Sequence, residues 1–261
     1  MGFYQKNGLR YFQFDIFNGE PMFHAVLTRR GGVSKPPFDS LNTGGTVGDD
    51  PDAVLENHRL IYRKLGFPFE SRFDVWQVHG TCILPADAPR PMAVPHPKAD
   101  GILTDRTGIT LFMRFADCVP ILFYDTRKRV IGIAHAGWQG TSQKIVGLAV
   151  AAMVERYATN PRDILAAIGP SICQKCYPVG SEVYHAFQEG FGTEAEQFFI
   201  QTDSGHYLDL WHANQFVLRK AGVNHIETAG LCTACHPEDW YSHRAENGKT
   251  GRFGVIMALE E

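Results

Sequence analysis

Residues 114–138 read RFADCVPILFYDTRKRVIGIAHAGW and set the architecture of the whole chain. Two apolar runs, 120–124 and 130–134, flank the polar residues 125–128, a pattern typical of a buried antiparallel hairpin. If Thr126 and Arg127 form a two-residue loop, Cys118 faces His135 across the hairpin. A longer loop would change this register, because loop length fixes which residues pair.

This register predicts that a thiol and an imidazole lie side by side. Opposed side chains have Cβ atoms about 4.5–5.5 Å apart, so a metal with bonds of about 2.0–2.3 Å fits between two of them. Two other interpretations remain open. Cys118 is a buried thiol near a histidine bonded to a carbonyl group, or the pair is the nucleophile and base of a cysteine hydrolase.

The composition is that of an ordinary globular protein. The chain has 261 residues, of which 44% are hydrophobic and 20% charged, with a formal charge of −3. This charge argues against a nucleic-acid-binding surface, which is normally basic. No apolar segment is long enough for a secretory signal or a membrane span. We therefore expect a cytoplasmic protein, in which the six cysteines are thiols or metal ligands rather than disulfides.

Residues that favour the start or end of a helix occur both before and after the hairpin in the sequence. Asp50 is a suitable N-cap and Pro51 a suitable first residue for a helix that ends at Gly66. Another helix is expected to begin at a Thr141 cap and to end at Asn160, and its N-terminus would attract anions. Further helices are expected over residues 181–189 and 209–221.

Patterns typical of β-strands account for much of the rest of the sequence. Strands are predicted over residues 22–28, 73–79, 101–104, 110–114, 164–168, 225–229 and 253–259. Between the first strand and the first helix, the glycine-rich segment 38–51 has no periodicity, and its glycines would allow the backbone to approach a ligand closely. A plain surface loop is the alternative for this segment.

A third metal-ligating side chain follows the strand predicted over residues 73–79. Alternation places Gln77 and His79 on one face of this strand. His79, Cys118 and His135 would give a metal three nitrogen and sulfur ligands and leave a fourth position for water, as in catalytic zinc sites. Zinc would then supply hydroxide near neutral pH, and zinc nucleobase deaminases use a similar His/Cys set. Asp117 is either a supporting carboxylate beside Cys118 or an exposed one.

Four other cysteines form two C-x-x-C pairs, Cys173 with Cys176 and Cys232 with Cys235. Paired C-x-x-C units form four-thiolate zinc sites in compact modules. Here predicted helices separate the pairs, so the sequence favours unligated thiols, with a second, structural metal as the alternative. A multicopper oxidase is disfavoured because none of the eleven histidines lies two residues from another.

Several motifs, taken in order, resemble those of the YfiH-like family, also called the laccase-domain or polyphenol oxidase family. The resemblance runs from about Met22 to Leu259 and rests on LNTGGTVGDDPDAVLEN, QVHG, ADCVPILFYD, IAHAGWQGT, IGPSI, YPVG, LDLW, CTAC and YSHRAENGKTGRFGVI. It implies a mixed α/β fold, a layered sandwich of two mainly antiparallel or mixed sheets with outer helices, as a single domain over residues 1–261. Gln139 and Thr46 depart from the residues common in the family, arginine and histidine respectively.

The resemblance also implies an activity. Family members are regarded as zinc-dependent purine nucleoside phosphorylases that convert adenosine, inosine, guanosine and 5′-methylthioadenosine to base plus ribose 1-phosphate, with adenosine deamination as a second activity. The family's metal ligands fall on His79, Cys118 and His135. Expected substrate-binding residues are Asn42, Arg59, Gln77 and Arg244, with phosphate lying near residues 137–141.

Two further classes of function remain open. One is copper-dependent polyphenol oxidation, since such a site could also bind copper in vitro. The other is a non-catalytic metal-dependent binding module. For the enzyme we expect purine nucleosides and phosphate as partners, no nucleic acid or membrane, and a monomer or small homo-oligomer.

Overall fold

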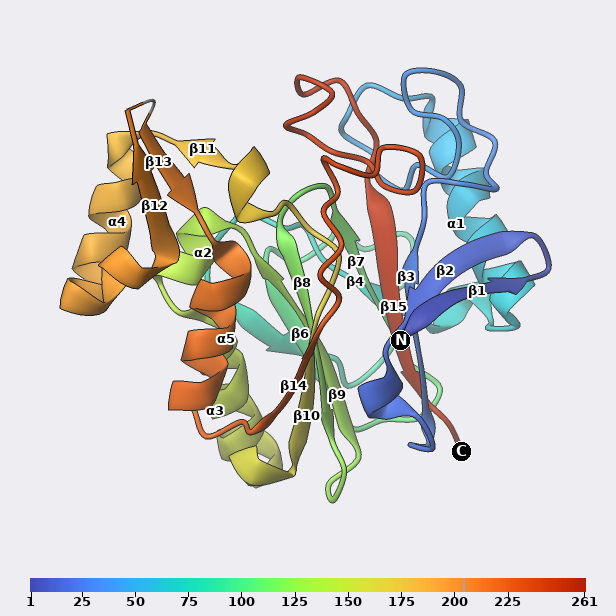
Figure 1. Cartoon of the computed structure of the whole chain (residues 1–261). Coiled ribbons are helices and arrows are strands. Elements are labelled where there is room, and N and C mark those ends of the chain that lie inside the picture. Colours follow the sequence, from blue (N-terminus) through green and yellow to red (C-terminus); the bar gives the residue numbers. More distant parts are fainter. Residues whose placement is uncertain (204) are drawn as a thin grey trace.

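Two six-stranded β-sheets pack face to face, and helices cover their outer surfaces (Figure 1). The computed structural model describes residues 1–203 and 205–261. The first sheet has the order β1-β2-β3-β15-β7-β4, formed by β1 (Gly2–Lys6), β2 (Leu9–Gln13), β3 (Met22–Leu27), β15 (Phe253–Leu259), β7 (Thr110–Phe115) and β4 (Arg72–Asp74). The second has the order β14-β10-β8-β9-β6-β5, formed by β14 (His225–Thr228), β10 (Ile164–Ile168), β8 (Val119–Asp125), β9 (Val130–Ala136), β6 (Gly101–Thr104) and β5 (Ile83–Pro85).

Helices and a small third sheet complete the chain. The α-helices are α1 (Pro51–Leu65), α2 (Trp138–Ser142), α3 (Ile145–Tyr157), α4 (Ser181–Phe191) and α5 (Leu210–Lys220). Short 3-10 helices are η1 (Asp15–Phe17), η2 (Phe69–Ser71), η3 (Pro161–Asp163), η4 (Gln174–Cys176) and η5 (Gly192–Phe198). The third sheet joins β11 (Pro178–Val179), β13 (Gly205–Leu208) and β12 (Phe199–Thr202). No helix among the described residues is both long and apolar enough to cross a membrane.

The central strand β8 shows why the layers form. All seven of its residues are buried, and successive side chains of a strand point to opposite faces. Ile121 and Phe123 pack among residues of α3 and α5, whereas Leu122 and Tyr124 pack against the first sheet. On the far side of the first sheet, α1 covers strands β3 and β15. The predicted mixed α/β sandwich is confirmed, with parallel pairs at β4–β7, β5–β6 and β10–β14.

The hairpin register differs from the predicted one. Asp125 pairs with Val130, and Pro120 rather than Cys118 pairs with His135. The loop therefore has four residues instead of two. The Asp125 carboxylate accepts hydrogen bonds from the amides of Arg127 and Lys128 at 2.8 and 2.9 Å, and this side-chain turn favours the longer loop.

Most other predicted elements are confirmed, with small differences at their ends. Asp50 caps α1 and accepts a hydrogen bond from the Asp52 amide. The predicted strand 73–79 is shorter, because β4 ends at Asp74. The helix expected from a Thr141 cap is two helices: Gly137 is the N-cap of the five-residue α2, and Lys144, with φ 60°, separates it from α3. The prediction of a long helix with an anion-binding N-terminus at this point is therefore wrong.

The four-residue hairpin loop depends on Asp125. Replacing Asp125 with alanine removes the acceptor of two amides, and we expect the free energy of unfolding to fall by about 1–2 kcal/mol. Asp125→Asn keeps an acceptor oxygen and should retain most of the stability. Urea unfolding measures both variants, and an unchanged midpoint for Asp125→Ala would contradict this account of the turn.

Candidate metal centre

The structure brings His79, Cys118 and His135 together. Their ligating atoms all lie within 4.8 Å of one another. His79 lies in the loop between β4 and β5, Cys118 between β7 and β8, and His135 near the end of β9. His135 is buried, Cys118 is half-buried and His79 is exposed, so the cluster is open on one side. One thiol and two imidazoles fit a divalent metal with a vacant fourth position.

Cys118 reaches the histidines through the backbone around it rather than through strand pairing with His135. Asp117, between β7 and β8, has a left-handed conformation with φ 77°. A Cβ atom at Gly137 would lie 2.9 Å from the Cys118 sulfur and 3.2 Å from the His79 ring. Gly137 therefore leaves the space in which the thiol and His79 approach each other.

A fully buried carboxylate, Asp100, supports both histidines. Its side chain contacts Nδ1 of His135 at 2.8 Å and accepts hydrogen bonds from the amides of Val78, His79 and Gly80 at 3.1, 3.0 and 2.7 Å. The contact with Nδ1 leaves Nε2 of His135 available to a metal, an arrangement common among metal-binding histidines. Asp100 is thus a positioning residue for two of the three ligands.

The protonation of the cluster is coupled. Burial alone would raise the pKa of the Cys118 thiol, but the charges and hydrogen bonds of His135 and His79 lower it to about 6. Burial opposes protonation of His135, yet the Cys118 charge and the Asp100 hydrogen bond raise its pKa to about 9. The thiol and the imidazole therefore favour each other's charged form, and a metal bound to both would displace a proton.

Asp117 is a buried supporting carboxylate. One oxygen accepts a hydrogen bond from the Thr233 hydroxyl at 2.6 Å, and the other accepts one from the Arg244 amide at 2.7 Å. Of the two interpretations of Asp117, the structure agrees with the supporting role. The residue connects the segment that carries Cys118 to the C-terminal loops.

The cluster opens into a cavity of about 880 Å³, a size suited to a small-molecule ligand. Residues from both sheets, α1 and α2 line it. Of the expected substrate-binding residues, Gln77 and Arg244 line this cavity. Arg59 is exposed on α1 and is not among the lining residues.

Two of the expected substrate-binding residues form internal bonds. Gln77 makes hydrogen bonds of 2.7 and 2.9 Å with the Arg114 backbone. Asn42 is fully buried, and its side-chain oxygen accepts hydrogen bonds from the amides of Gly44 and Arg252, both at 2.8 Å. Asn42 therefore fixes the glycine-rich loop against the segment that carries Arg252.

Several cavity residues were not singled out from the sequence. Arg72, Arg114 and Arg252 line the cavity together with the aromatic residues Trp76, Trp138 and Tyr177. Their spacing along the sequence forms no motif that would mark them as binding residues. Asp100 was missed as well, although its place directly before a buried strand next to the strand of His135 explains its role.

The Asp100 contacts lead to a test of metal binding. We expect Asp100→Asn to weaken the affinity for a divalent metal about 10–100-fold, because His135 loses its charged partner. Competition with a chromophoric chelator measures this affinity. Asp105→Asn, in a more exposed position, is the matched control, and equal affinities for the two variants would contradict the role of Asp100.

Comparisons with known proteins show which family this chain resembles. A family model described as multi-copper polyphenol oxidoreductase laccase matches residues 23–260. The purine nucleoside phosphorylase YlmD of Geobacillus stearothermophilus is 39% identical over 256 residues, which cover 93% of each chain. The purine nucleoside phosphorylase YlmD of Bacillus subtilis is 35% identical over 253 residues, covering 94% of this chain and 91% of that protein.

A solved structure shares the fold. The crystal structure of the Bacillus licheniformis hypothetical protein YfiH has a TM-score of 0.91 to this chain at 33% identity, covering 99% of each chain. The match to the family model over most of the chain and the similarity to these relatives lead to one conclusion. The chain belongs to the laccase-domain family that includes YlmD and YfiH, the family that its motifs predict.

Proposed function

We propose that this protein is a cytoplasmic, zinc-dependent purine nucleoside phosphorylase with His79, Cys118 and His135 as its zinc ligands. The observation that carries the proposal is that these three residues converge at a cavity large enough for a nucleoside and phosphate. The names of the YlmD relatives support the reaction. The proposed substrates are adenosine, inosine, guanosine and 5′-methylthioadenosine, with adenosine deamination as a second activity.

The distribution of charge supports a phosphate site at Arg244 and Arg252. Asp74 is fully buried and forms ion pairs with Arg72, Arg90 and Arg114. These arginines are therefore held by a carboxylate within the wall, although its single charge balances only one of the three. Within residues 1–203 and 205–261, neither Arg244 nor Arg252 forms an ion pair with a carboxylate. Their charges are therefore available to an anion in the cavity.

Arg252 lies close enough to the proposed metal ligands to respond to their charge. Burial lowers the pKa of Arg252, while the charges of Cys118 and Asp117 partly oppose this shift. An arginine is still charged at neutral pH. Phosphate bound by Arg252 would thus lie near the proposed zinc ligands, which is consistent with one shared reaction site.

The phosphorolysis step can be assigned to groups in the cavity. An oxygen of hydrogen phosphate attacks C1′ of the ribose, the C1′–N9 bond breaks, and the purine leaves with the bonding electrons. The phosphate proton passes to the departing base, which gives ribose 1-phosphate and free purine. Arg244 and Arg252 would orient the phosphate, and Trp76, Trp138 and Tyr177 offer apolar surfaces for the base.

Zinc held by the three ligands would supply Lewis acidity and activate water for deamination at the purine 6-position. Copper-dependent polyphenol oxidation, which the family description names, has less support. Among the described residues, the only groupings suited to a metal are this cluster and a set of four cysteines. Neither resembles the many-histidine sites of multicopper enzymes.

Product analysis tests the reaction. With inosine, metal-replete protein should release hypoxanthine only when phosphate is present. With adenosine, adenine reports phosphorolysis, whereas inosine and ammonia report deamination. His135→Ala should lose phosphorolysis together with the zinc bound by His79, Cys118 and His135. A variant that lost this zinc yet retained phosphorolysis would refute the metal's place in this reaction.

Phosphate kinetics test the arginine assignment. A charge-assisted hydrogen bond contributes about 1.5–3 kcal/mol, so Arg252→Gln and Arg244→Gln should each raise the KM for phosphate about 10-fold or more. Arg59→Gln is the matched control, because Arg59 lies outside the cavity lining. An increase for Arg59→Gln alone would restore Arg59 as the phosphate ligand and contradict the proposed site.

A further inference from the structure

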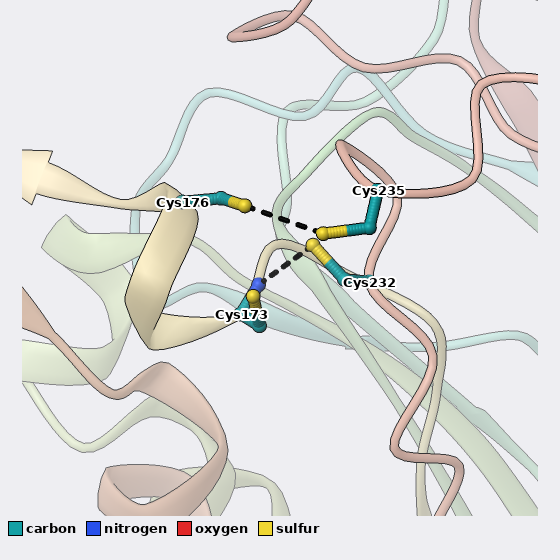
Figure 2. A group of neighbouring side chains, drawn as sticks. All are labelled: Cys173, Cys176, Cys232 and Cys235. Atoms are coloured by element: carbon teal, nitrogen blue, oxygen red, sulfur yellow. Dashed lines mark hydrogen bonds between the residues drawn. The ribbon is translucent and has the colours of Figure 1, made fainter.

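Four cysteines from two distant segments converge at a second site (Figure 2). Cys173 is the N-cap of the short helix η4 and Cys176 is its last residue, and Cys232 and Cys235 lie in the loop after β14. Their sulfur atoms all lie within 4.8 Å of one another. We call these four residues the cysteine cluster. The separation of the two pairs along the sequence had argued against a shared site, and the fold removes that objection.

The spacing of the thiols is close to that of a four-thiolate metal site. Zinc–sulfur bonds of about 2.3 Å in a tetrahedron place neighbouring sulfur atoms about 3.8 Å apart. The sulfur atoms of Cys176 and Cys235 are 3.4 Å apart. The Cys173 amide donates a hydrogen bond to the Cys232 sulfur at 3.3 Å, and such a bond stabilises a thiolate.

The backbone of both pairs is arranged for ligation. The Cys176 amide bonds to the Cys173 carbonyl at 3.0 Å, and the His236 amide bonds to the Cys232 carbonyl at 3.2 Å. These turns allow the two sulfur atoms of each pair to face the other pair, as Figure 2 shows. Cys235 is exposed and Cys232 is buried, so a metal can enter from the surface.

We propose that the cysteine cluster binds one structural zinc ion through four thiolates. Tetrahedral four-sulfur sites favour zinc or iron, and a closed set of four protein ligands is typical of structural rather than catalytic zinc. The site is distinct from the cluster of His79, Cys118 and His135. It shares no ligand with that cluster and leaves no ligand position open.

The proposed zinc has a specific role in the cavity wall. Tyr177, directly after Cys176, lines the cavity, and the Arg244 guanidinium lies 5.0 Å from its ring centroid. Thr233, directly after Cys232, donates a hydrogen bond to Asp117 at 2.6 Å. A metal joining the two cysteine pairs would therefore hold Tyr177, Arg244 and Asp117 in fixed relation beside the reaction site.

Metal analysis of variants tests the assignment. Wild-type protein purified under reducing conditions should contain about two zinc ions per chain. The double variant Cys176→Ser/Cys235→Ser should retain about one, and so should the control His135→Ala. A double cysteine variant with the zinc content of the wild type, or wild-type protein with iron in place of this zinc, would overturn the proposal. The two losses are independent, so failure of one site is distinguishable from failure of the other.

Alkylation of the wild-type protein gives a readout that requires no variant. Cys82 and Cys235 are both exposed, so exposure alone predicts that iodoacetamide modifies both. Zinc ligation predicts that Cys82 reacts and the cysteine cluster does not until a chelator removes the metal. Equal modification of Cys235 and Cys82 before chelation, or an intact mass showing disulfides within the cluster, would overturn the proposal.

Discussion

One buried carboxylate, Asp100, determines how two of the three candidate metal ligands come together. Asp100 lies directly before β6, and Gly101 pairs with Ala134 of β9, so sheet pairing brings Asp100 next to His135. The same carboxylate accepts hydrogen bonds from three backbone amides of the loop that carries His79. Burial would raise the pKa of Asp100, but the hydrogen bond and charge of His135 lower it. The carboxylate therefore remains ionised and orients two ligands at once.

The backbone around the cluster adopts unfavourable conformations that the surrounding structure maintains. His79 and Asp117 have φ values of 58° and 77°, in a region that costs residues other than glycine about 1–3 kcal/mol. Asp100 binds the His79 amide, and Thr233 and Arg244 bind the Asp117 carboxylate. Such conformations persist where neighbouring contacts determine them, and here they lie beside the ligating atoms.

The layered fold positions the charged groups around the candidate site. The buried strands β7 and β9 belong to opposite sheets, and their packing fixes the positions of Arg114 and His135. Asp74 pairs with arginines inside the wall, whereas Arg244 and Arg252 come from loops that line the cavity. Arg244 and Arg252 are therefore the two arginines to which the proposed function assigns phosphate.

Much of the architecture was determined by local sequence patterns. The apolar runs of β8 and β9 and the Asp50 cap of α1 follow from periodicity and capping. Side-chain chemistry singled out His79, Cys118 and His135, although the predicted pairing of Cys118 with His135 was wrong. Local patterns did not determine the loop length of the hairpin, the break at Lys144 or the early end of β4. These features depend on hydrogen bonds and packing, such as the Asp125 contacts with the loop amides.

Only the tertiary structure decided which distant residues meet. Asp100 approaches His135 through strand pairing, Arg59 lies outside the cavity lining while Arg252 lies within it, and the two cysteine pairs converge although predicted helices separate them. The physical reason is that spacing along a chain determines which face a residue occupies on its own element. It does not determine which other element packs against that face.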